Sequence, residues 1–164
     1  MKAEAFENVK NQIGLCGIWC GTCVVGNGTL RELTKRYEKI FKDYDLEELV
    51  TKDFSFKEFA NGLTSIQATP LCSGCRKGGG RDNCEMRTCA SGKGIEDCSE
   101  CDKQKACKNL NRLNHMRTGA QHAGLFLKTR KADQKRLIAK WMANLGDSWP
   151  CCILFMDDNQ PLNE

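Results

Sequence analysis

The chain has 164 residues, a formal net charge of +4 and twelve cysteines against only two histidines. This length suits one domain of ordinary size. No stretch approaches the roughly eighteen consecutive apolar residues of a membrane span, and the start, MKAEAFENVKNQIG, lacks the apolar run of a secretory signal. We therefore expect a cytoplasmic protein with no membrane contact, in which cysteines stay reduced and bind metal more often than they form disulfides.

The N-terminal half predicts three helices. Residues 3–13 place apolar side chains at helical spacing before a glycine. Thr29 and Glu32 have the spacing of a capping box, in which a side-chain oxygen and a carboxylate satisfy the free amides of a first helical turn. Ser55 and Glu58 repeat that spacing. We therefore expect helices that begin at the two capping positions.

The C-terminal half predicts an irregular region followed by helices. Residues 72–102 are rich in glycine and charge, and they indicate turns and short knuckles. A helix is expected to resume near Gln104, and a last helix over about 132–145 has Gly146 as its C-terminal cap. The tail WPCCILFM predicts either a strand or a packed end. The expected fold class is mainly α, a small metal-stapled domain with an irregular cysteine-rich zinc-knuckle centre.

We expect a single domain over residues 1–164. Its cysteine-rich metal-binding parts are residues 14–26 and 71–108, with a helical insert at 27–70 between them and a basic helical part at 109–164. The first part has only three cysteines, so it cannot complete a four-ligand site alone. We therefore expect the N-terminal cysteines to be tied to the second cysteine-rich part.

Ten cysteines are the candidate metal ligands. Pairs separated by two residues can turn both sulfurs toward one ion, and tetrahedral zinc takes four such ligands at about 2.3 Å. Ten ligands exceed the eight that two zinc ions need, so we expect two ions and two spare thiols. The remaining pair, Cys151 and Cys152, lies in PCCILF and is expected to be buried as small apolar residues. The ten are Cys16, Cys20, Cys23, Cys72, Cys75, Cys84, Cys89, Cys98, Cys101 and Cys107.

The spacing of the pairs also predicts how the ligands are shared. A zinc-ribbon-like arrangement would combine Cys72 and Cys75 with Cys98 and Cys101. The second ion would then take Cys20 and Cys23, together with two of Cys16, Cys84, Cys89 and Cys107.

An iron–sulfur cluster is the alternative cofactor, because thiolates also bind such clusters. The spacing of Cys16, Cys20 and Cys23 is the one that radical S-adenosylmethionine enzymes use for a four-iron cluster. The barrel of those enzymes needs more residues, in alternating strands and helices, than this chain offers. A smaller cluster-binding protein, for electron transfer or cluster-dependent catalysis, stays open.

The motifs CGIWCGTC, CSGC, CEMRTCA and KGIEDCSEC, with a further cysteine before KNL, resemble a cysteine-rich bacterial and archaeal family of unknown function. Its members are described as candidate zinc-binding proteins. The resemblance covers about residues 14–113 and implies that the ten cysteines are metal-binding positions. The sequence departs from the family at Arg81, where members often have another cysteine, and in its longer basic region after residue 113.

The function favoured by these features is a non-catalytic zinc-binding or scaffold protein with closed four-cysteine sites. No catalytic residue is expected: His115 and His122 are predicted to be surface residues, and five carboxylates are predicted to lie unpaired in solvated turns. Those carboxylates are Asp82, Glu85, Glu96, Asp97 and Glu100.

A basic segment is the candidate contact for an anionic partner. Residues 103–140 contain eleven lysines and arginines against one acid, so an acidic protein or a nucleic acid could bind there. The alternative is that these side chains cover solvated helix faces. The positions expected to carry such a contact are Lys128, Arg130, Lys131, Lys135 and Arg136.

Overall fold

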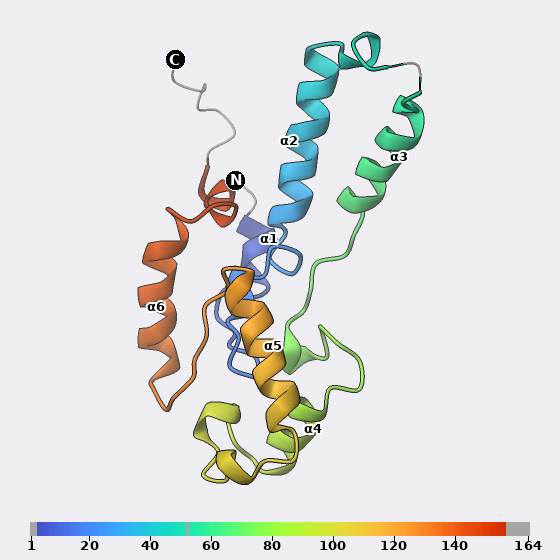
Figure 1. Ribbon diagram of the computed structural model, residues 1–164. Coiled ribbons are helices and arrows are strands. Elements are labelled where there is room, and N and C mark those ends of the chain that lie inside the picture. The colour runs from blue at the N-terminus through green and yellow to red at the C-terminus, as the bar shows by residue number, and fades with distance from the viewer. Residues whose placement is uncertain (1–2, 52, 157–164) are drawn as a thin grey trace.

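The structure, a computed structural model, describes residues 3–51 and 53–156. Within these residues it contains α-helices, short 3-10 turns and two isolated β-bridges, so the predicted mainly α class is confirmed. Figure 1 shows how these elements are arranged. The helices are α1 (Ala3–Glu7), α2 (Thr29–Asp43), α3 (Phe56–Gln67), α4 (Glu85–Gly92), α5 (Leu110–His122) and α6 (Gln134–Leu145). The 3-10 turns are η1 (Cys20–Thr22), η2 (Leu46–Glu48), η3 (Cys75–Lys77), η4 (Cys98–Glu100), η5 (Gln104–Ala106) and η6 (Cys151–Phe155).

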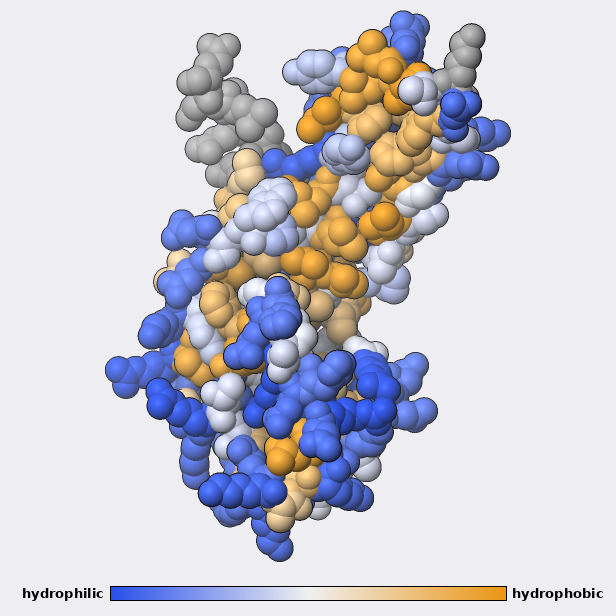
Figure 2. All heavy atoms as spheres, viewed as in Figure 1, coloured by the Kyte–Doolittle hydropathy of each residue, from blue (hydrophilic) through white to orange (hydrophobic). Residues whose placement is uncertain are grey.

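Helices α2 and α3 form a hairpin that extends away from the other helices (Figure 1). Aromatic rings join the two helices, with the centroids of Phe41 and Phe59 4.9 Å apart. Figure 2 shows apolar surface gathered over this hairpin, and hydrophilic surface gathered toward the opposite end of the molecule. The hairpin itself contains no cysteine, so the candidate ligands all belong to the remaining elements.

The two predicted capping boxes have different outcomes. Ser55 caps α3 as expected, because its hydroxyl accepts a hydrogen bond from the Glu58 amide at 3.4 Å. Helix α2 begins at the predicted Thr29, but its N-cap is Gly28, which makes no side-chain cap bond. The Asn27 side-chain oxygen instead accepts from the Thr29 amide at 2.9 Å. The predicted threonine cap is therefore wrong, although the helix start is right.

The main hydrophobic core centres on Trp19, which is fully buried. Its indole stacks on Phe126 and Trp141, with ring centroids 5.9 and 5.7 Å away. Trp141 belongs to α6, which begins at a cap in which Asp133 accepts from the Arg136 amide at 2.8 Å. The core also includes Cys151, as predicted, because the tail forms the turn η6 and packs inward. Cys152, which was expected to be buried with it, is only partly buried.

Three predicted boundaries are corrected. The opening helix ends at Glu7, and Ile13 instead forms an antiparallel bridge with Trp19. The helix expected near Gln104 begins at Leu110, since residues 104–106 form only a 3-10 turn. The region expected to hold only turns contains the helix α4, which buries Met86 and Ala90. Of the C-terminal part predicted over 109–164, residues 157–164 lie outside the described residues. No helix in the described part of the chain is long and apolar enough to cross a bilayer.

Candidate metal centre

Six cysteines line one cavity of about 230 Å³. They come from three parts of the sequence: the N-terminal loop, the segment that follows α3, and the residue that precedes α4. Backbone at glycines, a few apolar side chains, Arg81 and Arg87 complete the walls. We call this space the six-cysteine cavity, and its cysteines are Cys16, Cys20, Cys23, Cys72, Cys75 and Cys84.

The N-terminal loop is held in place by residues between its cysteines. Trp19 fixes the loop in the core, and its indole donates a hydrogen bond to the Lys10 carbonyl at 2.8 Å. Gly17 has a φ of +92°, and a Cβ there would lie 2.4 Å from the carbonyl oxygen of Lys128. This close approach requires glycine. The sulfurs of Cys16 and Cys20 are therefore presented by a loop with little freedom.

The segment around Cys72 is a tight knuckle. Gly74 adopts a left-handed φ of +85°, and its amide donates to the Cys72 sulfur at 3.3 Å. Gly79 lies so close that a Cβ would be 2.8 Å from the same sulfur. The turn directs Cys72 and Cys75 into one cavity, as the spacing between them predicts.

The N-terminal loop contacts the second cysteine-rich part at several points. The guanidinium of Arg76 donates to the Ile13 carbonyl at 3.0 Å and to the Glu96 carbonyl at 2.6 Å. The Gln12 side chain donates to the Ser73 carbonyl at 3.1 Å. These bonds hold the two cysteine-bearing segments together across about sixty residues of sequence.

The other four cysteines surround a much smaller space of about 20 Å³. Helix α4 provides the first, the turn η4 and its C-terminal cap provide the next two, and the cap of η5 provides the last. The ammonium of Lys93 donates to the Cys101 sulfur at 3.4 Å. We call this space the four-cysteine cavity, and its cysteines are Cys89, Cys98, Cys101 and Cys107.

The two cavities correct the predicted sharing of ligands. Cys72 and Cys75 lie with Cys20 and Cys23, and they do not share a cavity with Cys98. The reason is the bonding of the N-terminal loop, which brings its cysteines against the 72–75 knuckle; pair spacing alone carries no information on that contact. The cavities are neighbours, because the Cys98 amide donates to the Leu15 carbonyl at 2.8 Å.

Burial favours the protonated form of one thiol in each cavity. Burial raises the pKa of the Cys20 thiol to about 11, and burial likewise raises the pKa of Cys98 to about 11. A bound cation would reverse this preference, since thiolates are the metal-binding form. Among the described residues, no three cysteine sulfurs lie within 4.8 Å of one another.

A buried ion-pair cluster lies between the cavities and α6. The Lys128 side chain is fully buried, and its ammonium lies 2.7 Å from Asp97 Oδ2 and 2.8 Å from Glu100 Oε1. Together with Glu96 these carboxylates form a compact acidic group, which corrects the prediction that they lie unpaired in solvated turns. Lys128 cannot belong to an exposed partner surface, so its predicted role in partner contact is wrong.

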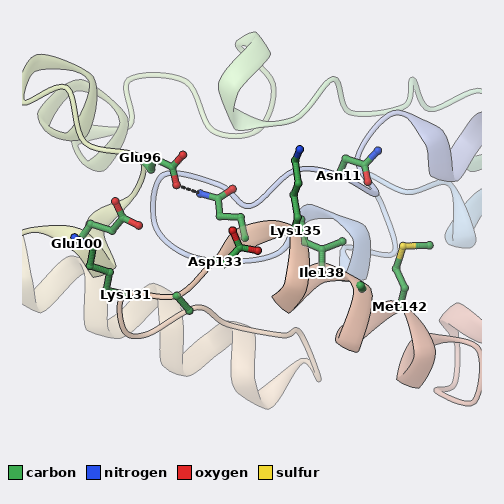
Figure 3. A pocket seen from close by; sticks show the side chains of 11 residues that line it. Asn11, Glu96, Glu100, Lys131, Asp133, Lys135, Ile138 and Met142 are labelled. Carbon is green, nitrogen blue, oxygen red and sulfur yellow. Dashed lines mark hydrogen bonds between the residues drawn. The ribbon is translucent and has the colours of Figure 1, made fainter.

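A charged cleft of about 980 Å³ runs beside this cluster. Figure 3 shows Glu96 and Glu100 at one end and Ile138 and Met142 of α6 along the wall, with Gln134 donating to Glu96 at 2.8 Å. Lys131 and Lys135 line the same cleft as these acids, so the predicted basic surface is of mixed charge here. Four of the five positions predicted for partner contact are exposed: Arg130, Lys131, Lys135 and Arg136. His115 and His122 are also exposed, as predicted.

The fold and its cavities define a class: a mainly helical protein with ten cysteines around two neighbouring spaces. The chain belongs to the family described as "Protein of unknown function (DUF3795)", which matches residues 12–112, more than half of its length. The matched range includes all ten of these cysteines. No curated protein and no solved structure matches this chain. The zinc binding that the sequence resemblance implies stays a prediction.

Proposed function

We propose that this protein binds metal through both cysteine cavities, and that the bound metal stabilises the fold around them. One observation carries the proposal: ten cysteines from distant segments converge on two adjacent cavities, while every cysteine in the described residues is free of disulfide bonds. Thiolates are strong ligands for zinc and for iron–sulfur clusters. Chance placement of ten small apolar residues would not group them in this way.

The four-cysteine cavity is the candidate zinc site. Its cysteine number equals the coordination number of structural zinc, and its volume of about 20 Å³ is close to the 10–15 Å³ that a single water-sized body needs. Zinc would draw the four sulfurs inward. Such contraction is available because three of the four belong to short turns and their caps rather than to long helices.

The proposed role is structural rather than catalytic. A catalytic zinc keeps one position open for water or substrate, whereas four thiolates close the coordination sphere. The nearest basic group on the cavity wall is the ammonium of Lys93, which already donates to Cys101. The protein would therefore act as a metal-stabilised binding or scaffold module. The partner contact at Arg130, Lys131, Lys135 and Arg136 stays a separate prediction.

Elemental analysis of protein purified without oxygen tests the proposal. We expect at least one metal per chain, and chelation should lower the thermal midpoint and helical circular dichroism, since structural zinc supplies roughly 10–16 kcal/mol in small modules. Cys107→Ser should reduce metal content. Cys152→Ser is the matched control, because Cys152 is partly buried but lines neither cavity. Less than one metal per chain, with a melting curve insensitive to chelation, would overturn the proposal.

A further inference from the structure

We infer that the six-cysteine cavity holds a four-iron iron–sulfur cluster, whereas the four-cysteine cavity holds a single ion. This inference rests on the proposed function, that both cavities bind metal. It adds the chemical class of the cofactor at the larger one. Two features of the cavity carry it, its volume and its walls, and the separation of its sulfurs is compatible with a cluster.

In both cavities the sulfurs are spaced more widely than those around a bound zinc, so a zinc ion would have to draw four of them inward. Four thiolates on one zinc lie about 3.8 Å from one another, which follows from tetrahedral bonds of about 2.3 Å. A two-zinc site with bridging thiolates requires the same close spacing around each ion. No three cysteine sulfurs of the described chain lie within 4.8 Å of one another. A four-iron cluster separates its thiolates further, because each sulfur bonds a different iron.

Volume distinguishes the two cavities, which share this wide spacing. About 230 Å³ is open in the six-cysteine cavity, against about 20 Å³ in the four-cysteine cavity. The smaller space accepts one water-sized body. The larger one has room for the irons and sulfides of a cluster among its ligands. A single zinc would leave most of that space unfilled.

The cavity walls combine apolar surface with positive charge, which suits an anionic cluster. Val9, Ile18 and Leu125 provide apolar surface, while Arg81 and Arg87 add positive charge. The Gly74 amide already donates to the Cys72 sulfur at 3.3 Å, and amide bonds to ligand sulfurs are a recognised means of tuning such clusters. Glycines at positions 14, 26 and 79 keep the lining free of side chains beside the sulfurs.

A four-iron cluster needs only four of the six cysteines. Cys16 and Cys75 lie close together, because a Cβ on Gly14 would be 3.6 Å from both the Cys16 sulfur and the Cys75 Cβ. Cys23 and Cys72 likewise meet at Gly26, where a Cβ would be 3.6 Å from the Cys23 sulfur and 3.1 Å from the Cys72 Cβ. We assign Cys75 as one of the four ligands, with the other three from the same cavity.

Anaerobic purification of the full chain, followed by assays of iron, acid-labile sulfide and zinc, tests the inference. We expect about four irons and four sulfides per chain, with broad visible absorbance and Mössbauer parameters of a four-iron cluster. Zinc without iron would overturn the inference and leave the proposed function standing. Absence of every metal would overturn both. This reading needs only the wild-type chain, so it does not depend on how a variant folds.

Matched variants test the ligand assignment. Cys75→Ser should lose iron and sulfide but keep the zinc of the four-cysteine cavity, whereas Cys107→Ser should lose zinc and keep the visible absorbance. Cys152→Ser changes a cysteine that lines neither cavity and should keep both iron and zinc. Native mass spectrometry reports these contents on the folded fraction. Full iron in Cys75→Ser would overturn the assignment, as would loss of iron in Cys152→Ser when its helical circular dichroism is normal.

Discussion

Replacing Lys128 with methionine should destabilise the protein strongly, because the change leaves a buried carboxylate without its counter-ion. Both Lys128 and Asp97 have fully buried side chains, with 2.7 Å between Nζ and Oδ2. Removing one partner of a buried ion pair costs about 3–5 kcal/mol. Asp97 keeps its bond from the Ser99 amide at 2.7 Å, and Glu100 is partly exposed and can be hydrated. We therefore expect the lower end of the range, about 3 kcal/mol.

Urea and thermal unfolding of the metal-loaded protein measure this loss. A change of about 3 kcal/mol corresponds to a fall of about 6–12 °C in the thermal midpoint of a chain of this size. Lys131→Met is the control, since Lys131 is exposed three residues away and should leave the midpoint unchanged. Adding Asp97→Asn to Lys128→Met should recover part of the loss. For a chain of this size, each kcal/mol of lost stability lowers the thermal midpoint by about 2–4 °C. A thermal midpoint of Lys128→Met within about 2 °C of wild type would therefore refute the reasoning.

Two further substitutions test local features. Gly17→Ala should lower the free energy of unfolding by more than about 1–3 kcal/mol, which is the usual cost of backbone strain alone. The position has a φ of +92°, and the added Cβ would also lie 2.4 Å from the Lys128 carbonyl oxygen. Gly119→Ala is the control, because a Cβ there would meet open space on α5, and it should leave the thermal midpoint unchanged or raise it. Equal thermal midpoints for the Gly17 and Gly119 variants would contradict the argument. Ser55→Ala should destabilise α3 by about 0.5–1 kcal/mol; hydrogen exchange at the Glu58 amide should rise, and unchanged protection there would show that the cap contributes nothing.

The sequence predicts helices best where the signal is local. Ser55 accepts the amide bond predicted for it as an N-cap, and α6 ends at Leu145, where its predicted range ends. Helix α4 was missed because its apolar face is short: in a glycine-rich setting only Met86 and Ala90 are buried. The Thr29 cap failed because Asn27, two residues earlier, already bonds the Thr29 amide.

For the candidate site, the set of cysteines could be proposed from the sequence but their grouping could not. Pair spacing correctly places Cys72 and Cys75 in one cavity. It cannot show that Arg76 bonds the Ile13 carbonyl and so brings that pair to the N-terminal loop. The buried ion pair of Lys128 and Asp97 could not be predicted either, because nothing in a run of charged residues distinguishes a lysine that faces inward.

Helix α4 links the two cavities mechanically. Cys84, at its N-cap, lines one cavity, and Cys89 within it lines the other. A rigid eight-residue helix cannot adjust its two ends independently. A displacement of the helix at one cavity would therefore move a wall of the other, although each cavity keeps its own set of cysteines.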